Sequence, residues 1–234
     1  MANEAVDNWH DFPRRAVELA YTVAGIRPGR ASVVHDPFAT LPSGNVGTKG
    51  SAWGVAAGTV TFEQTQRGGV IKVDNGTSDA SLTLGTFPDN PTLFNQPLTG
   101  ERWVCGVRFK CEAAPTVDSA LSLGIINQAF TRNIGVGYHG ATNDGVFHFW
   151  AGNFTASGSA DVLSTSVPLD TGWHEAFFGG NNTPASVWCV FDGVAVGAMA
   201  LTYYDGPATG LLIDRNPASK PFWCDDVIYV CDAN

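Results

Sequence analysis

The chain has 234 residues, of which 13 are basic and 22 acidic, and its formal net charge is −9. A negative charge of this size repels phosphate backbones and excludes nucleic acid as an expected partner. The 27 glycines, the 13 prolines and the low charged fraction of 15% are typical of a turn-rich β protein with one large core.

The first residues, Met1-Ala2-Asn3-Glu4, lack the basic and apolar segments of a secretion signal. No window approaches the roughly 18 apolar residues of a membrane span, so we expect a soluble chain that is synthesised in the cytosol. The five cysteines are odd in number and contain no C-x-x-C pair, which predicts reduced, buried thiols and no zinc site: Cys105, Cys111, Cys189, Cys224 and Cys231.

Residues 1–30 are expected to form an N-terminal arm outside the main domain. Their apolar residues recur every three or four positions, as on one face of a helix: Phe12, Ala16, Leu19, Val23 and Ile26. Asp11 can cap such a helix and Gly25 can end it. Residues 17–23 also alternate as in a strand, so both structures fit residues 12–24, and we favour the helix.

The apolar face of this arm has two interpretations. It can cover the protein's own core, or it can dock on another subunit. If it docks, the residues expected to bind the partner are Phe12, Val17, Leu19, Tyr21 and Val23.

From residue 33 onward, short strand-like segments alternate with turns. Residues 102–111 are the clearest strand, with Trp103, Cys105, Val107 and other apolar residues on a core face and an opposite face expected to be mostly solvated. Residues 171–197 predict a three-stranded meander whose second turn is Asp192-Gly193, a strong signal for a type I′ hairpin. In all, some 12 to 14 strands are expected, which favours a two-sheet antiparallel sandwich over residues 31–234.

The order of three motifs carries a family resemblance. They are Gly172-Trp173-His174-Glu175, then Asp192-Gly193-Val194 at the end of a strand, and finally the terminal run Asp225-Asp226-Val227. In this order they resemble the concanavalin A-like lectin/glucanase superfamily, which includes laminin G-like domains. Residues 35–38 and 53–60 are similar to the opening of the same jelly rolls. The resemblance implies an all-β jelly-roll sandwich over about residues 33–231.

Catalytic patterns are missing from the sequence. Glucanases of this superfamily carry E-x-D-x-E or E-x-D-x-x-E on one strand, and no such run is present. No G-x-S-x-G motif marks a nucleophilic serine. His174 and Glu175 are interpreted as strand residues, and we expect a protein that is not an enzyme.

Two binding sites are hypothesised. In the superfamily a calcium ion often joins the last strand to the first, which would place Asp36 near Asp225 or Asp226; the alternative is that Asp226 is bonded to backbone amides. A glycan could stack on aromatic residues in strands or turns, although most such rings should belong to the core: Tyr138, His139, Trp150, Trp188 and Trp223.

The combination of an acidic jelly roll, an apolar arm and no catalytic set suggests assembly. It is similar to the lectin-like proteins that tailed bacteriophages attach to their particles. We therefore expect a virion protein, a capsid decoration or head-fibre component, that binds the major capsid protein or another virion protein and forms a homo-oligomer. The alternatives are a lectin or adhesin for cell-surface glycans and, third, a divergent glycoside hydrolase.

Overall fold

The computed structural model describes residues 11–36, 53–57, 59–65, 68–74, 80–84, 102–111, 120–127, 132–139, 144–153, 160–182, 185–203, 208–215 and 221–232. In these ranges one helix, α1 (Asp11–Thr22), precedes fifteen strands. Within the described residues, no helix is long and apolar enough to cross a membrane.

The strands run in chain order as follows: β1 (Ala31–Asp36), β2 (Trp53–Ala57), β3 (Thr59–Thr65), β4 (Gly68–Asp74), β5 (Ala80–Leu84), β6 (Arg102–Cys111), β7 (Ala120–Asn127), β8 (Asn133–His139), β9 (Val146–Gly152), β10 (Ala160–Pro168), β11 (His174–Asn182), β12 (Ala185–Phe191), β13 (Val194–Ala200), β14 (Ala208–Arg215) and β15 (Phe222–Asp232).

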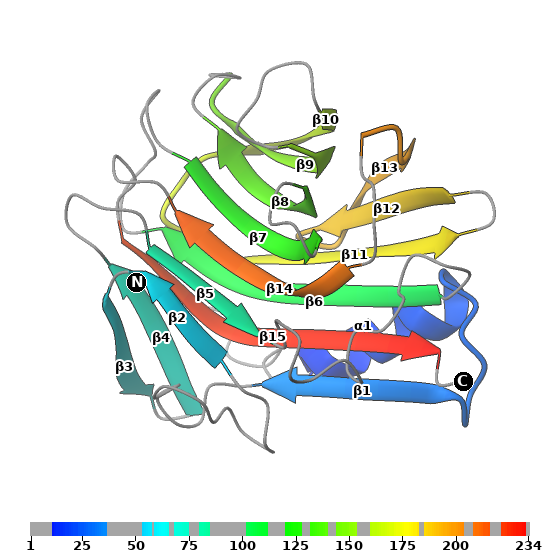
Figure 1. Cartoon of the computed structure of the whole chain (residues 1–234), viewed down its shortest axis with the longest axis horizontal. Coiled ribbons are helices and arrows are strands. Elements are labelled where there is room, and N and C mark those ends of the chain that lie inside the picture. Colours follow the sequence, from blue (N-terminus) through cyan, green and yellow to red (C-terminus); the bar gives the residue numbers. More distant parts are fainter. Residues whose placement is uncertain are drawn as a thin grey trace, which may run out of the picture.

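The strands form two antiparallel sheets that face each other (Figure 1). The eight-stranded sheet has the order β13-β12-β11-β6-β15-β4-β3, with β1 also paired to β15. The seven-stranded sheet has the order β10-β9-β8-β7-β14-β5-β2. Neighbouring strands are often distant in the sequence, which is the connectivity of a jelly roll, and the predicted all-β sandwich is confirmed.

The meander expected over residues 171–197 is present as β11, β12 and β13. Asp192 and Gly193 join the last two strands with positive φ angles of 48° and 79°, as a type I′ turn requires. β13 forms one edge of the eight-stranded sheet.

The main core lies between the sheets and follows the two-residue period of the strands. β6 contributes Trp103, Cys105, Val107 and Phe109, and β15 contributes Val227 and Tyr229 from the adjacent strand. Strand side chains alternate between faces, so these residues leave Val104, Gly106 and Arg108 on the outer face of β6.

Helix α1 covers that outer face (Figure 1). Phe12, Ala16 and Ala20 are fully buried on it. They pack against four buried residues of the sheet: Val104, Phe177, Ile228 and Val230. The expectation of a mostly solvated outer face on β6 is therefore wrong, because the arm removes Val104 and Arg108 from water.

The end of α1 is held by the backbone around Gly25. Gly25 has a φ of 69°, and the amide of Ile26 donates to the carbonyl of Ala20 at 2.8 Å. The guanidinium of Arg102 donates to the Gly25 carbonyl. The predicted helix is confirmed, but it ends at Thr22, so Val23 falls outside the buried stripe.

Replacing Phe12 with Ala tests the packing of α1. The Phe12 ring lies 4.9 Å from the Phe177 ring and is fully buried, so its loss should lower the free energy of unfolding by about 3–5 kcal/mol. Urea denaturation followed by tryptophan fluorescence measures this change. The matched control is Val23→Ala, which alters a side chain that is 53% exposed and should change stability by less than about 0.5 kcal/mol. Equal effects of the two substitutions would contradict the packing.

Candidate functional site

An ionic cluster lies on the outer face of the eight-stranded sheet, beside the first turns of α1. We define it as Arg15, Arg108, Glu175, Asp225 and Asp226. Arg15 of α1 contacts Glu175 of β11 at 2.8 Å. On β6, Arg108 lies 3.6 Å from Glu175 and 3.5 Å from Asp225. The cluster therefore links the helix to three neighbouring strands.

A β-bulge in β15 shapes this cluster. The pairing of β15 with β6 shifts between Cys224 and Asp226, so that Asp225 is the additional residue and Asp226 lies opposite Arg108. Simple alternation places the two carboxylates on opposite faces of the strand. Because Cys224 and Val227 both belong to the inner core, the bulge instead leaves both carboxylates on the outer face. There Asp225 lies 3.5 Å from Arg108, and Asp226 contacts His35 of β1 at 2.6 Å.

Burial controls the protonation of the cluster. Asp225 is 4% exposed, and desolvation raises its pKa to about 7, with the charge of Asp226 adding to the shift and Arg108 opposing it. Desolvation also raises the pKa of Glu175, against the attraction of Arg15 and Arg108. Within this cluster, the pair of Arg15 with Glu175 connects α1 to the sheet.

A row of tryptophan and lysine side chains crosses the same sheet next to the cluster. We call Trp173, Lys110, Trp223 and Lys72 the tryptophan–lysine row. Trp223 is opposite Lys110 on one side and Lys72 on the other. Their ammonium groups lie 4.7 Å and 5.2 Å from the centre of its ring. Lys110 is also 5.1 Å from the Trp173 ring, so it lies between the two indoles.

The row differs from the ionic cluster in its exposure. All four of its residues are partly exposed, whereas Arg108, Asp225 and Asp226 are buried. Trp173 and Trp223 are separated by two inter-strand steps, or about 10 Å. This surface offers aromatic rings next to ammonium groups, and it suits a ligand that has apolar faces as well as hydroxyl or anionic groups.

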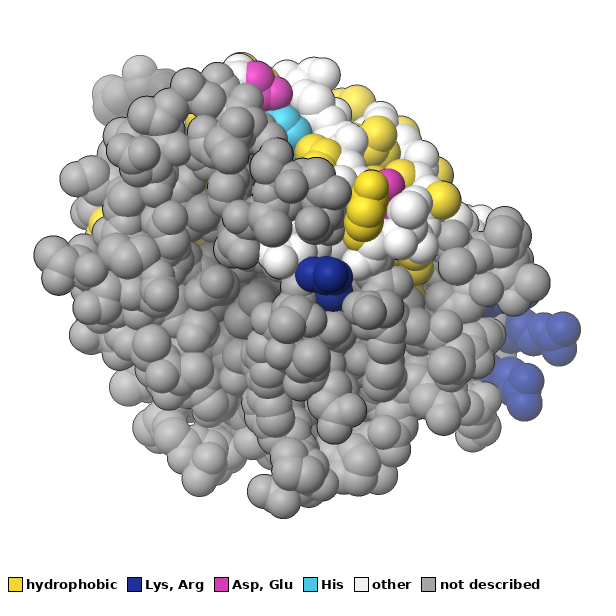
Figure 2. Space-filling view, turned by 45° about the horizontal axis from the view of Figure 1, so that its top comes forward, with side chains coloured by type: hydrophobic (Ala, Val, Ile, Leu, Met, Phe, Trp, Pro, Cys, Tyr) yellow, Lys and Arg dark blue, Asp and Glu magenta, His cyan; other side chains and the backbone are white. Residues whose placement is uncertain are grey.

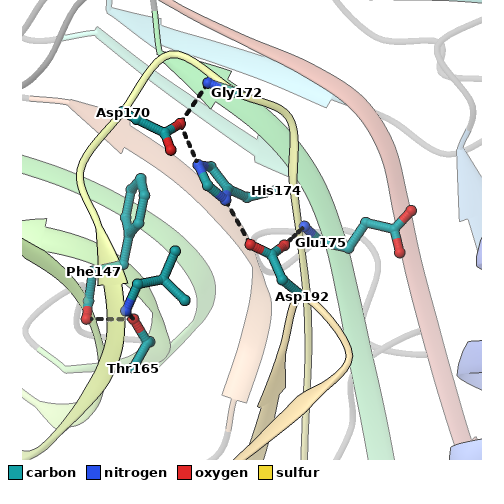
Figure 3. A network of polar contacts seen from close by, with 8 residues as sticks. Phe147, Thr165, Asp170, Gly172, His174, Glu175 and Asp192 are labelled. Atoms are coloured by element: carbon teal, nitrogen blue, oxygen red, sulfur yellow. Dashed lines mark hydrogen bonds and ion pairs between the residues drawn. The ribbon is translucent and has the colours of Figure 1, made fainter. Parts of the chain in front are cut away.

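His174 is the centre of a third polar group (Figure 3). Its Nδ1 lies 2.8 Å from Asp192, and its Nε2 lies 3.1 Å from Asp170. Asp192 also accepts a hydrogen bond from the backbone amide of Glu175 at 2.9 Å. These contacts fasten the turn between β12 and β13 and the segment before β11 to the start of β11.

The environment of His174 indicates a structural role. The imidazole is buried beside Phe109, Phe147 and Phe191, with a ring-centre distance of 4.7 Å to Phe147. Burial lowers its pKa, but hydrogen bonds and charges from Asp192 and Asp170 outweigh this effect and the net shift is upward. His174 is a strand residue as predicted, and its two carboxylate partners were not foreseen.

The residues predicted to bind glycans differ in their exposure. Tyr138 and Trp150 are 4% and 3% exposed, so their rings are not available for stacking. Trp150 instead donates to Asn133 at 2.7 Å. Trp188 is partly exposed on β12, and Trp223 belongs to the tryptophan–lysine row. His139 ends β8, but its side chain lies outside the described residues.

The calcium hypothesis stays a prediction, and the structure shows only where its residues lie. β1 pairs with β15, and Asp36 lies opposite Val227, so the first and last strands are adjacent as expected. The side chain of Asp36 is outside the described residues. Among the described residues, no group of three or more His, Cys, Asp or Glu side chains could hold a metal. Asp225 and Asp226 face Arg108 and His35 instead of an oxygen-lined cage.

The residues predicted to bind a partner also differ in their exposure. The prediction that Phe12 binds a partner is wrong, because Phe12 is buried against the protein's own sheet and cannot reach another subunit. Val17 and Leu19 pack at the edge of that same contact. Tyr21 and Val23 are 37% and 53% exposed. Docking of the arm on the protein's own sandwich, the first of the two interpretations, is the arrangement observed.

Trp173, Lys110 and Lys72 were not among the residues predicted to bind a ligand. Each follows from strand register and not from local spacing, because the three belong to segments far apart in the sequence. The one usable signal was the position of Lys110 on the outer face of a clear strand. Its partners became visible only when the order of the strands was known.

No protein-family model and no curated protein sequence matches the chain. Similarity to solved structures shows the fold. The carbohydrate esterase from the Shiga toxin-encoding bacteriophage phi24B is 16% identical, with a TM-score of 0.59 over 87% of this chain and 100% of that one. An endo-1,3-β-glucanase from Streptomyces sioyaensis is 11% identical, with a TM-score of 0.58 over 89% and 99% of the two chains.

The binding domain of botulinum neurotoxin DC, solved in complex with SialylT, is 10% identical. Its TM-score is 0.52 over 78% of this chain and 44% of that one. All three neighbours have concanavalin A-like jelly rolls, in agreement with the resemblance of the sequence motifs. The fold of this chain is that of carbohydrate-binding, glycoside hydrolase and esterase jelly-roll proteins.

The substitution Asp225→Asn tests the buried cluster through pH. The folded-state pKa of Asp225, about 7, lies above the value of 3.8 for a free side chain, so the folded protein binds more protons between these limits. The stability of the wild-type protein relative to the Asn variant should therefore fall as pH rises from about 4 to 7 and be constant above that range. Urea denaturation at a series of pH values measures the difference.

Phe12→Ala is the control for this experiment. It lowers stability without removing a titrating group, so its difference from the wild type should be independent of pH over the same range. If the difference between wild type and Asp225→Asn is also independent of pH, or rises with pH, Asp225 is ionised in the folded protein throughout and the assigned environment is wrong.

Proposed function

We propose that this protein binds carbohydrate on the tryptophan–lysine row. The observation that carries this proposal is the placement of two partly exposed indole rings on either side of Lys110, with Lys72 beside the second ring. The apolar face of a sugar ring can lie on an indole, while its hydroxyl or acidic groups accept hydrogen bonds from the ammonium groups.

The surroundings of the row support this assignment. The ionic cluster beside it is buried and internally paired, so it does not compete for ligand. The chain has only 13 basic residues, and three of them lie on β4 and β6, the two strands that flank β15 on this face: Lys72, Arg108 and Lys110. The proposal also agrees with the fold, since one of its structural neighbours was solved with SialylT and two others are named as a carbohydrate esterase and a glucanase.

Binding to an array of neutral and acidic glycans tests the proposal. A positive glycan should lose at least tenfold in affinity with Trp223→Ala or Trp173→Ala, because each substitution removes one stacking surface. Isothermal titration calorimetry gives the affinities. Trp188→Ala is the matched control, since this partly exposed tryptophan of the same sheet lies outside the row. A blank array, or an equal loss in the control, would remove the row as the site.

A second proposal is a role in a bacteriophage particle, as a capsid decoration or head-fibre protein. The observation that favours it is β13, an edge strand with the uncharged sequence VAVGAMA. Val194 is 63% exposed, and most of the strand is exposed with it. Hydrophobic side chains are visible towards the upper right of Figure 2. Edges of this kind accept a strand from a partner.

The particle role relies on β13 and not on α1, whose apolar face is already covered by the protein's own sheet. A capsid protein or another virion protein is the proposed partner, and the virion is the proposed location. One structural neighbour is phage-encoded, which agrees with this proposal. The fold is also compatible with catalysis, because two of the neighbours are named as enzymes.

The substitution Ala198→Lys tests the particle role. Ala198 is exposed on β13, so a lysine there should leave the fold intact while placing a charge on the edge. Co-sedimentation with purified phage particles should fall at least tenfold. Val162→Lys, at a 46% exposed position of β10, is the control and should co-sediment as the wild type does. Undiminished co-sedimentation of Ala198→Lys would exclude β13 as the attachment site.

A further inference from the structure

A serine, a histidine and an aspartate lie together on the outer face of the seven-stranded sheet, on the opposite side of the molecule from α1. They are Ser164 of β10, His148 of β9 and Asp144 in the turn before β9. Phe147 and Phe149 point into the core, as does Leu163, so the alternating residues His148 and Ser164 project from the outer face. None of the three belongs to the ionic cluster or to the tryptophan–lysine row.

His148 is buried, and only one of its two ring nitrogens has a hydrogen-bond partner among the described residues. It is 5% exposed, and its Nε2 lies 3.0 Å from a carboxylate oxygen of Asp144. A carboxylate only accepts hydrogen bonds, so the neutral imidazole carries its proton on Nε2 and has an acceptor at Nδ1. That Nδ1 is buried and has no hydrogen-bond partner among the residues that the structure describes. An unsatisfied buried nitrogen is uncommon in a folded protein and calls for an explanation.

Ser164 is directly opposite His148 in the antiparallel register of β9 and β10. Side chains in such pairs have Cβ atoms about 4.5–5.5 Å apart, so the Ser164 hydroxyl and the His148 imidazole are neighbours on this face. The Oγ accepts a hydrogen bond from the amide of Ser166 at 3.2 Å, which does not use the hydroxyl proton. Ser164 is exposed, so a ligand can approach it from solvent.

The backbone next to Ser164 is irregular. The pairing of β10 with β9 shifts between Ser164 and Pro168, and Ser166 has a φ of 61°, a strained value for a residue with a side chain. Thr165 anchors this bulge by donating to the carbonyl of Phe147 at 2.8 Å. The bulge ends the regular ladder immediately after Ser164 and leaves the serine at an open edge of the sheet.

We propose that Ser164, His148 and Asp144 form a hydrolytic site for short-chain acyl esters. His148 Nδ1 takes the hydroxyl proton as Ser164 Oγ bonds to the acyl carbon, and Asp144 stabilises the imidazolium through Nε2. The ester C–O bond then breaks, and the leaving alcohol receives the proton from Nδ1. Water attacks the acyl-serine, gives its proton to Nδ1 and releases the carboxylic acid, after which the proton returns to Ser164.

The position of Ser164 indicates the class of substrate. β10 is the edge strand of its sheet, and the preceding residue on the same face, Val162, is 46% exposed. An exposed edge can meet an ester carried on a large molecule, and the single exposed apolar side chain beside Ser164, Val162, offers contact for a short acyl group. The site therefore fits short acyl groups on a polymer better than a free lipid.

A fluorophosphonate probe tests this proposal on the full chain. The folded protein should gain one adduct, and peptide mapping should place it on Ser164, with no adduct in Ser164→Ala. His148→Gln and Asp144→Asn should slow labelling and 4-nitrophenyl acetate hydrolysis, the former by about 10²-fold or more because it removes the general base. Asp144 is exposed enough that its substitution should leave the fold intact, which circular dichroism verifies.

Ser186→Ala is the matched control, because Ser186 is a partly exposed strand serine of the other sheet, opposite Ala200 and Asn181 and not a histidine. Its labelling should equal that of the wild type. The proposal is overturned if Ser164 gains no adduct in the folded wild-type protein, or if folded Asp144→Asn and His148→Gln react at the wild-type rate. Glycan binding by the tryptophan–lysine row should be unchanged in Ser164→Ala, so the two sites can fail independently.

Discussion

β6 and β15 pair antiparallel in the middle of the eight-stranded sheet and contribute side chains to both of its faces. The inner faces of these strands supply Trp103, Phe109 and Tyr229 to the core between the sheets. Their outer faces supply Val104, Ile228 and Val230 to the second core beneath α1. The same two strands therefore hold both hydrophobic cores, and a shift of one residue in their register would exchange the two sets of side chains.

The β-bulge at Asp225 allows charged side chains to be accommodated where β15 pairs with β6. It inserts one residue beside Arg108, whose buried guanidinium lies near one carboxylate of β15, Asp225, and one of β11, Glu175, while Asp226 contacts His35. The desolvation of Asp225 opposes its ionisation, so this part of the molecule is not arranged for maximal stability at neutral pH. The ionic cluster instead fixes the orientation of α1, because Arg15 can pair with Glu175 only when the helix lies in one orientation on the sheet.

Burial separates the groups that hold the fold from those that are available to ligands. His174, with its two carboxylates, resembles a catalytic group in the sequence, but it is enclosed by phenylalanine rings and fastens two chain segments. Trp150 is likewise enclosed, whereas Trp173 and Trp223 are partly exposed. Ser164 is exposed and lies opposite a buried histidine that has one unsatisfied nitrogen. Residue type alone does not distinguish these cases, since exposure depends on which layer covers each face.

Elements with a strong local signal could be predicted from the sequence. The helix of the arm, the strand at 102–111, the Asp192-Gly193 turn and the two-sheet class all follow from periodicity and turn chemistry, which act over a few residues. The docking position of α1, the exposure of each tryptophan and the pairs of residues that meet across strands could not be predicted, because they depend on contacts between distant segments. Lys110 meets Trp223, and Ser164 meets His148, through register between segments that the sequence does not place together. Such contacts depend on strand order and on one-residue bulges, and neither has a signature in local spacing.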